Sequence, residues 1–133
     1  MPTLFSKIIA WEIPCTKVFE DDVTFAFLDI NPINKGHTLL VPKEEFTRMT
    51  DVPDELLGYM FMVAKDIMEA MKASLDCDYV MVHVEGTEVP HFHIHLIPMH
   101  TWTKVASWQH TTYAPNEASE LADKIAWKLS QNS

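Results

Sequence analysis

The sequence has very few of the residues that bind nucleic-acid backbones. Arg48 is the only arginine, and ten Lys and Arg residues stand against nineteen Asp and Glu residues, so the formal net charge is −9. Binding along a nucleic-acid backbone needs clustered Lys and Arg, so we expect no nucleic-acid polymer as a partner. If the ligand is anionic, imidazoles and backbone N–H groups must attract it locally.

Cysteine is equally scarce. Cys15 and Cys77 are the only two, and they form neither a CxxC pair nor a regular spacing. This favours free thiols in a reducing compartment over a disulfide framework. The sequence also lacks an apolar run long enough to cross a bilayer, and its first residues lack a signal-peptide pattern. We therefore expect a cytoplasmic protein with no membrane partner.

The size and composition suit one ordinary domain. The chain has 133 residues, of which 47% are apolar, and no internal repeat, low-complexity tract or linker interrupts it. We predict a single domain over 1–133. Its core is expected at about 3–100, with an irregular segment and a helix over 101–133.

Hydrophobic spacing divides the chain into helices and strands. Apolar residues recur at intervals of three and four in the predicted helices, which span 4–11, 53–74 and 115–129. Alternation and turn residues predict strands within 17–30 (two strands), 38–42, 78–85 and 90–98. These strands do not alternate regularly with helices, which favours an α+β fold with a mainly antiparallel sheet.

Three histidines stand at every second position of the last predicted strand, in the stretch VPHFHIHLIP. Side chains at alternate positions of a strand share one face, so His91, His93 and His95 are predicted to point together. The apolar residues between them form the opposite face and are predicted to be core: Phe92, Ile94 and Leu96.

Three explanations of this pattern stay open. A purely structural role is the least favoured explanation, because each buried imidazole needs hydrogen-bond partners for two ring nitrogens. A metal site is limited by geometry, because the first and third Cα atoms of the trio lie about 13 Å apart in a strand. Two of the three could bind an ion together with a further ligand, such as His83 or His37.

The third explanation is phosphate chemistry with histidine as the nucleophile. A neutral imidazole can attack phosphorus, while neighbouring imidazoles donate to the phosphate oxygens and protonate the leaving group. Three evenly spaced histidines suit a polyphosphate or a phosphodiester better than a point ion.

The residues resemble a known family. The stretch HFHIHLI resembles the His-φ-His-φ-His-φ-φ signature (φ, apolar) of the histidine triad nucleotide-binding proteins. The similarity runs from about residue 3 to 100 and includes FLDINP and GHTLLVPK in the family's order. It implies a histidine triad fold, with about five antiparallel strands, two main helices and a sheet that dimerisation extends.

The resemblance also implies an activity. Family members hydrolyse nucleoside phosphoramidates, dinucleoside polyphosphates or other nucleotidyl compounds through a nucleotidyl-histidine intermediate and release a nucleoside monophosphate. We therefore expect a homodimeric hydrolase that acts on a nucleotide substrate, with purine nucleotides as the expected ligands and no cofactor.

Roles follow by position from the same resemblance. His93 is the expected nucleophile, and His95 is expected to contact the phosphate and the leaving-group oxygen. His91 and His37 resemble a supporting pair, and Asp29 resembles the carboxylate that binds the ribose hydroxyls. Asp29 is equally explained as a cap on the following turn. Six apolar residues resemble those that form the slot around the base, although periodicity alone would explain them as core residues. They are Leu4, Phe5, Ile8, Phe27, Leu28 and Ile30.

The loop before the triad departs from the family pattern. EGTEVP is shorter than the Gly-rich loop of the better-known members, in which a Gln and a Ser or Thr contact the phosphate and the leaving group. Thr87 is expected to donate to the substrate there. Glu88 would repel a phosphate unless it points away or meets a basic leaving group.

Two further functions remain open beside the hydrolase. One is a nucleotide-binding regulatory module with little catalysis, and the other is a metal-dependent hydrolase that uses two triad histidines. Some bacterial relatives carry a structural zinc on an N-terminal CxxC, and this chain lacks those cysteines. We expect no zinc at that place.

Overall fold

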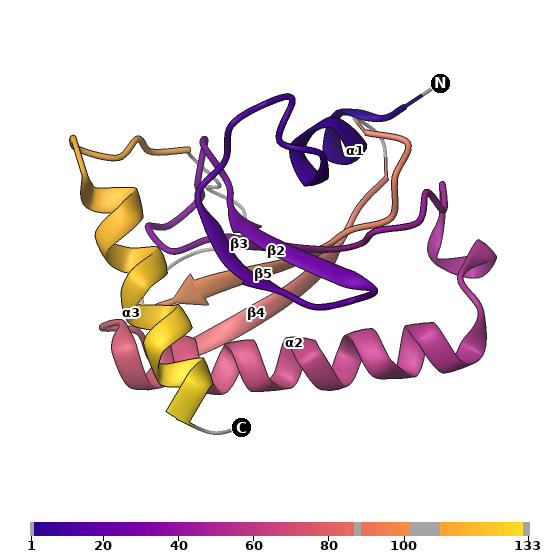
Figure 1. The fold of residues 1–133 in the computed structure, drawn as a ribbon. Coiled ribbons are helices and arrows are strands. Elements are labelled where there is room, and N and C mark those ends of the chain that lie inside the picture. Colours follow the sequence, from indigo (N-terminus) through magenta and orange to yellow (C-terminus); the bar gives the residue numbers. More distant parts are fainter. Residues whose placement is uncertain (1, 87–88, 102–109, 132–133) are drawn as a thin grey trace.

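The structure, a computed structural model, describes residues 2–86, 89–101 and 110–131. Figure 1 shows its elements along the chain. They are α1 (Leu4–Ile9), β1 (Lys17–Glu20), β2 (Thr24–Leu28), β3 (Thr38–Pro42), the 3₁₀ turn η1 (Met49–Asp51), α2 (Asp54–Ser74), β4 (Tyr79–Val84), β5 (Ile94–Met99) and α3 (Glu117–Gln131).

The five strands form one antiparallel sheet in the order β1-β2-β3-β5-β4. The long helices α2 and α3 cover one face of this sheet, and the short helix α1 lies over the other (Figure 1). The predicted α+β fold with five antiparallel strands and two main helices is therefore confirmed. Among the described helices, none is long and apolar enough to span a membrane.

The main core lies between the sheet and α2. The helix buries one stripe of side chains spaced by three and four residues: Met60, Val63, Ala64, Ile67, Ala70 and Met71. From the sheet, Ile94 and Leu96 are fully buried and Phe92 is nearly so, which confirms that this side of the histidine stretch is core. Full burial of a side chain such as Ile94 stabilises the fold by about 1.5–3 kcal/mol.

The last strand is shorter than predicted. β5 begins at Ile94 and not at residue 90, because the chain before it bonds outside the sheet. The N–H of Phe92 donates to the carbonyl of Phe46, and the N–H of His91 donates to the carbonyl of Val89. The alternation of faces nevertheless continues through this segment, since both His91 and His93 are buried on the side opposite Phe92.

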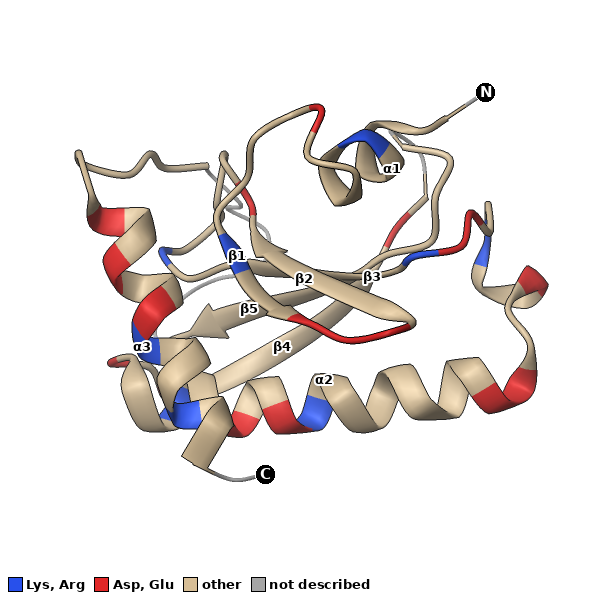
Figure 2. Cartoon of the chain, viewed as in Figure 1, with Lys and Arg blue, Asp and Glu red and all other residues tan. Residues whose placement is uncertain are grey.

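Surface charge and cysteine chemistry agree with the composition. Figure 2 shows Lys and Arg in short, separated segments, with no continuous basic stripe on the described elements. Cys15 and Cys77 are free thiols, as predicted.

Candidate active site

A cavity of about 260 Å³ lies on the face of the sheet that α1 covers. Segments far apart in the sequence meet there: α1, the loop after β2, strand β3, the end of β4 and the histidine stretch. The residues that line it are Leu4, Phe5, Asp29, Ile30, Asn31, Leu39, Glu85, Val89, His93 and His95.

His93 presents one basic nitrogen in this cavity. Its Nδ1 lies 2.8 Å from the carbonyl oxygen of His91, so Nδ1 carries the ring proton and donates it there. Burial lowers the pKa of His93, which keeps the ring neutral near pH 7. A neutral imidazole has one proton, and Nε2 is therefore left with its lone pair. The ring of Phe5 packs edge-on against His93, with 4.8 Å between the ring centroids, and limits its rotation.

His95 is held in the opposite tautomer by a chain of hydrogen bonds. The N–H of Ile33 donates to Nδ1 of His37 at 3.1 Å, so the proton of His37 is on Nε2. This Nε2–H donates to Nδ1 of His95 at 2.9 Å. His95 must then carry its own proton on Nε2. The site thus pairs a nitrogen that can attack, on His93, with an N–H that can donate, on His95.

The rings of His37 and His95, which form this chain of hydrogen bonds, are both neutral at pH 7. Burial, together with the neighbouring imidazoles, lowers the pKa of His37 to about 3. The same two causes lower the pKa of His95 to about 4. The hydrogen bond between these two rings is therefore one between neutral groups.

His91 is fully buried and has a structural set of partners. Its Nε2–H donates to the carbonyl of Pro42 at 2.8 Å, and its Nδ1 accepts from the hydroxyl of Thr3, 2.7 Å away. The prediction that His91 and His37 form a pair is wrong. The register of β3 and β5 aligns Leu39 with His95, and this brings the nearby ring of His37 to His95. His91 lies four residues before His95 in the sequence and is not within reach of His37.

Asp29 joins the cavity to the turn that follows β2. Its Oδ1 accepts the N–H of Asn31 at 2.9 Å, which is the capping role that the sequence left open. Its Oδ2 lies 3.8 Å from Nε2 of His37, and this approach is not an ion pair at pH 7 because His37 is neutral. The carboxylate also lines the cavity, where binding of ribose hydroxyls stays a prediction.

A family model for the HIT domain matches residues 10–102, which is more than half of the chain. The chain belongs to the HIT family. It is 44% identical over 99 residues to an uncharacterised HIT-like protein of Methanocaldococcus jannaschii, covering 71% of this chain and 77% of that protein. It is 30% identical over 135 residues to an adenosine 5'-monophosphoramidase of Schizosaccharomyces pombe, covering 97% and 99% of the two chains. The crystal structure of a HIT-like protein from Bartonella henselae has a TM-score of 0.83 and 30% identity, with 95% of each chain covered.

The apolar residues assigned to the base slot of the HIT site, apart from Leu28, divide into two groups. Leu4, Phe5 and Ile30 line the cavity, and Ile30 is 76% exposed at its rim. Ile8 and Phe27 lie on the same face but are packed into the core beside Phe5. Their contact with a base stays a prediction.

Of the remaining two assigned residues, one lies on the other face of the sheet and one is not described by the structure. Leu28 lies on the opposite face of the sheet, in the core beneath α2, and its assignment to the base slot is corrected. The reason is the alternation of β2, which places Phe27 on the histidine face and Leu28 on the other. Thr87 lies outside the described residues.

The HIT site also brings together a possible ligand set for a metal ion. Ligand atoms of Asp29, His37 and His95 lie within 4.8 Å of one another, and two imidazoles with a carboxylate suit several divalent ions. The hydrogen bonds oppose this use. Because His37 already accepts the N–H of Ile33 at Nδ1, binding an ion through Nε2 would leave the ring with no proton at all. The network therefore favours a proton between His37 and His95.

Two residues that the sequence interpretation left without a role in catalysis lie beside the HIT site. His83 is the cross-strand partner of His95, with 5.5 Å between the ring centroids, and Glu85 lines the cavity. The alternation of β4 could have indicated Glu85, which follows His83 by two positions. The Nδ1–H of His110 donates to the backbone carbonyl of Asn31, and this contact over 79 residues has no sequence signal.

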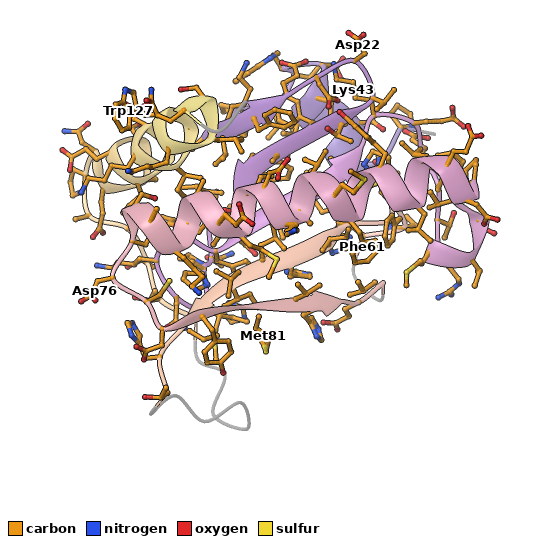
Figure 3. All side chains as sticks on the ribbon, turned by 90° about the horizontal axis from the view of Figure 1, so that it is seen from below. Asp22, Lys43, Phe61, Asp76, Met81 and Trp127 are labelled. Carbon is orange, nitrogen blue, oxygen red and sulfur yellow. The ribbon has the colours of Figure 1, made fainter. Side chains whose placement is uncertain are left out.

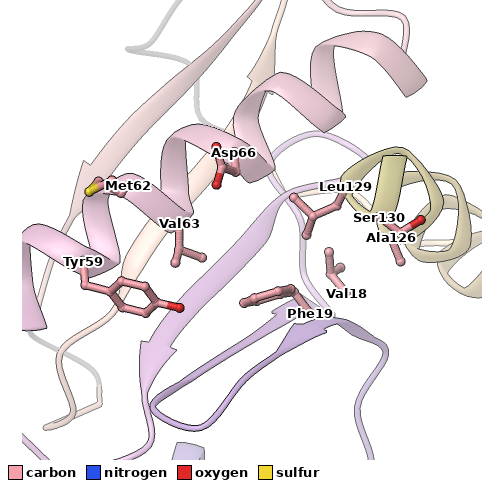
Figure 4. Close-up of a pocket in the computed structure, with 9 residues that line it drawn as sticks. All are labelled: Val18, Phe19, Tyr59, Met62, Val63, Asp66, Ala126, Leu129 and Ser130. Carbon is pink, nitrogen blue, oxygen red and sulfur yellow. The ribbon is translucent and has the colours of Figure 1, made fainter. Parts of the chain in front are cut away.

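A larger cavity of about 430 Å³ lies on the other side of the sheet, between β1, α2 and α3. Figure 4 shows Tyr59 and Asp66 of α2 there, with Val18 and Phe19 of β1 and Leu129 of α3. Among the residues that the structure describes, its lining contains neither histidine nor cysteine. The smaller cavity is therefore the candidate active site of this HIT protein.

Proposed function

We propose that this HIT protein hydrolyses nucleoside phosphoramidates or related nucleotidyl compounds through a nucleotidyl intermediate on His93, releasing a nucleoside monophosphate. The hydrogen bond from Nδ1 of His93 to the carbonyl of His91 carries this proposal, because it presents Nε2 as the attacking nitrogen. Nucleophilic catalysis needs such an oriented, neutral imidazole. The similarity to a monophosphoramidase over nearly the whole chain supports it.

The reaction has two displacements at phosphorus. In the first, Nε2 of His93 forms a bond to the α-phosphorus, and the bond to the leaving group breaks with its electron pair. The ring then carries a positive charge, which the carbonyl of His91 stabilises at Nδ1. In the second, water attacks phosphorus and the electron pair of the N–P bond returns to His93. For a phosphoramidate, solvent supplies one proton to the departing amine and receives one from the attacking water.

His95 acts in this scheme as a hydrogen-bond donor to the phosphate oxygens. Its Nδ1 already accepts from His37, so loss of the Nε2 proton would produce an imidazolate. Hydrogen-bond donors aimed at the charge that develops in the transition state stabilise it, and removal of one such donor costs about 10²–10³ in kcat.

Incubation with adenosine 5'-phosphoramidate tests the function, with nucleotide release measured in the presence and absence of a chelator. We expect chelator-resistant turnover in the wild type, none in His93→Ala, and full turnover in His100→Ala, which removes a histidine that does not line the cavity. Mass spectrometry of rapidly quenched protein should find a nucleotidyl adduct on His93. Undiminished turnover in His93→Ala would overturn the mechanism, and tight nucleotide binding without turnover would favour the regulatory module. Loss of activity to the chelator, restored by zinc, would favour the metal-dependent hydrolase.

We also propose a homodimer formed through β4. This strand is an edge of the sheet, and its exposed side chains include Tyr79, Val82 and Val84. Figure 3 shows Phe61 of α2 and Met81 of β4 on this side of the molecule. An exposed apolar edge strand tends to pair with another chain, and a second copy would extend the sheet. Sedimentation analysis of the wild type and of Val82→Lys tests this, with a monomer expected for the variant.

Three broader expectations stay proposals: a single histidine triad domain over 1–133, a cytoplasmic location and a purine nucleotide as the ligand.

A further inference from the structure

The leaving group finds no proton donor in the histidine triad. Nε2 of His93 is the attacking nitrogen, and its Nδ1–H is bound to a backbone carbonyl. His95 cannot give up its proton while it accepts from His37, and His91 is bonded away from the cavity to Pro42 and the hydroxyl of Thr3. Whatever receives the leaving group must therefore lie elsewhere in the cavity.

Glu85 lies on the β4 side of the cavity, opposite the side that holds Asp29. Two carboxylates flank His95: Asp29 beside His37 on the β3 side, and Glu85 beside His83 on the β4 side. If Asp29 binds the ribose, the group on the other side of the phosphorus lies toward Glu85. The side chain of Glu85 is 52% exposed, so it lies at the mouth of the cavity, through which a product leaves.

The position of Glu85 is supported by its neighbour on β4. Nε2 of His83 lies 3.3 Å from a carboxylate oxygen of Glu85, and the two residues stand on the same face of the strand. His83 is itself aligned with His95 across the β4–β5 pairing. Glu85, which directly follows β4, thus lines the same cavity as His93 and His95.

The charge of the cavity lining should favour a cationic leaving group over an anionic one. The described residues that line it include two carboxylates, Asp29 and Glu85, and no Lys or Arg. A polyphosphate leaving group carries several negative charges and would be repelled at the mouth. An amine becomes an ammonium ion when it departs and would be attracted there.

We propose that Glu85 determines leaving-group specificity by binding the departing amine, so that the preferred substrates are nucleoside phosphoramidates of amines with an additional positive charge. This inference rests on the proposed function and names its substrate class. As the P–N bond breaks, its electron pair goes to nitrogen, which takes one proton from solvent. The amine then takes a second proton from solvent and leaves as an ammonium ion paired with the Glu85 carboxylate.

A pair of substrates with one nucleotidyl group tests this inference. Adenosine 5'-phosphoramidates of an aminoalkylamine and of a carboxyalkylamine differ only in the charge of the tail. We expect the wild type to have the higher kcat/KM for the cationic tail. Glu85→Gln should reduce this preference about two- to fivefold, which is the upper part of the range for one ion pair at a half-exposed position. Glu85→Lys should reduce it further or invert it.

Glu69→Gln is the matched control, because it makes the same change of charge on an exposed position of α2, across the sheet from the cavity. Its preference should equal that of the wild type. An unchanged ratio in both Glu85 variants, with turnover of both substrates, would overturn this inference and leave the proposed function standing.

Binding separates the two proposals if neither substrate is cleaved. Nonhydrolysable adenosine 5'-sulfamates with the same two tails can be compared by calorimetry. Tighter binding of the cationic analogue, lost in Glu85→Gln, supports the role of Glu85 even where the proposed hydrolysis has failed. Equal binding of both analogues by the wild type would overturn it.

Discussion

Because His37 is neutral in the folded protein, we predict that the free energy of unfolding decreases in mild acid. His37 is 1% exposed, and burial lowers its pKa from an ordinary value of 6.5 to about 3. Below pH 6.5 the unfolded chain binds a proton at this position, whereas the folded chain does not until about pH 3. The fold therefore loses stability as the pH falls through this window. By pH 5 the loss from His37 is about 2 kcal/mol.

Urea unfolding at pH 7 and at pH 5 measures this loss. His37→Gln removes the titrating ring, and we expect the difference in the free energy of unfolding between the two pH values to shrink by about 2 kcal/mol. His95, with its pKa at about 4, contributes in the same direction and keeps part of the pH dependence in the variant. Carboxylates with lowered pKa values, such as Glu20 and Asp21, lose their contribution mainly below pH 5, since the unfolded chain protonates them only near their ordinary pKa.

Leu39→Ala is the matched control for this experiment. Leu39 is buried on the same face beside the histidines and carries no titrating group. Its truncation should lower the free energy of unfolding at both pH values and leave their difference unchanged. If His37→Gln loses as much stability as the wild type between pH 7 and pH 5, His37 is not held neutral and the hydrogen-bond chain to His95 is refuted.

Three further substitutions test the packing around the site by the same urea assay. Gly36→Ala should cost about 1–3 kcal/mol, because Gly36 has a φ of +103° and an added Cβ would lie 2.6 Å from a methyl carbon of Leu75, whereas Gly58→Ala meets open space and should not destabilise. Thr3→Val should cost about 1–3 kcal/mol, because it removes the hydroxyl that caps α1 and bonds a buried imidazole; an unchanged midpoint would contradict this. Ile94→Ala should cost about 2–5 kcal/mol, because the side chain is fully buried beneath α2, and a smaller loss would mean that the core collapses around it.

Local periodicity predicted the elements well where neighbours in sequence decide them. The third strand was predicted at 38–42, where β3 lies, and the long helix was predicted at 53–74, within one residue of α2. The start of β5 was misplaced by four residues, because it depends on a contact with Phe46, which lies 46 positions before Phe92. A periodic pattern contains no information on where a ladder of hydrogen bonds stops.

The site shows the same division. The sequence alone determined which side each residue of the histidine stretch faces, because a period of two is a property of the backbone itself. Through the family resemblance it also predicted His93 as the nucleophile, a role that stays a proposal. Leu28 was misplaced because β2 alternates in the same way, which turns Leu28 to the face opposite Phe27.

Only the tertiary structure decided how the imidazoles are connected. Each ring has two nitrogens and, when neutral, one proton, so its chemistry depends on the partner that the other nitrogen meets. Those partners, Ile33 for His37 and Pro42 for His91, come from β3 and the loop before it, and the register of β3 against β5 brings His37 to His95. Burial between sheet and helix then keeps the rings neutral, which no pattern of letters along the chain expresses.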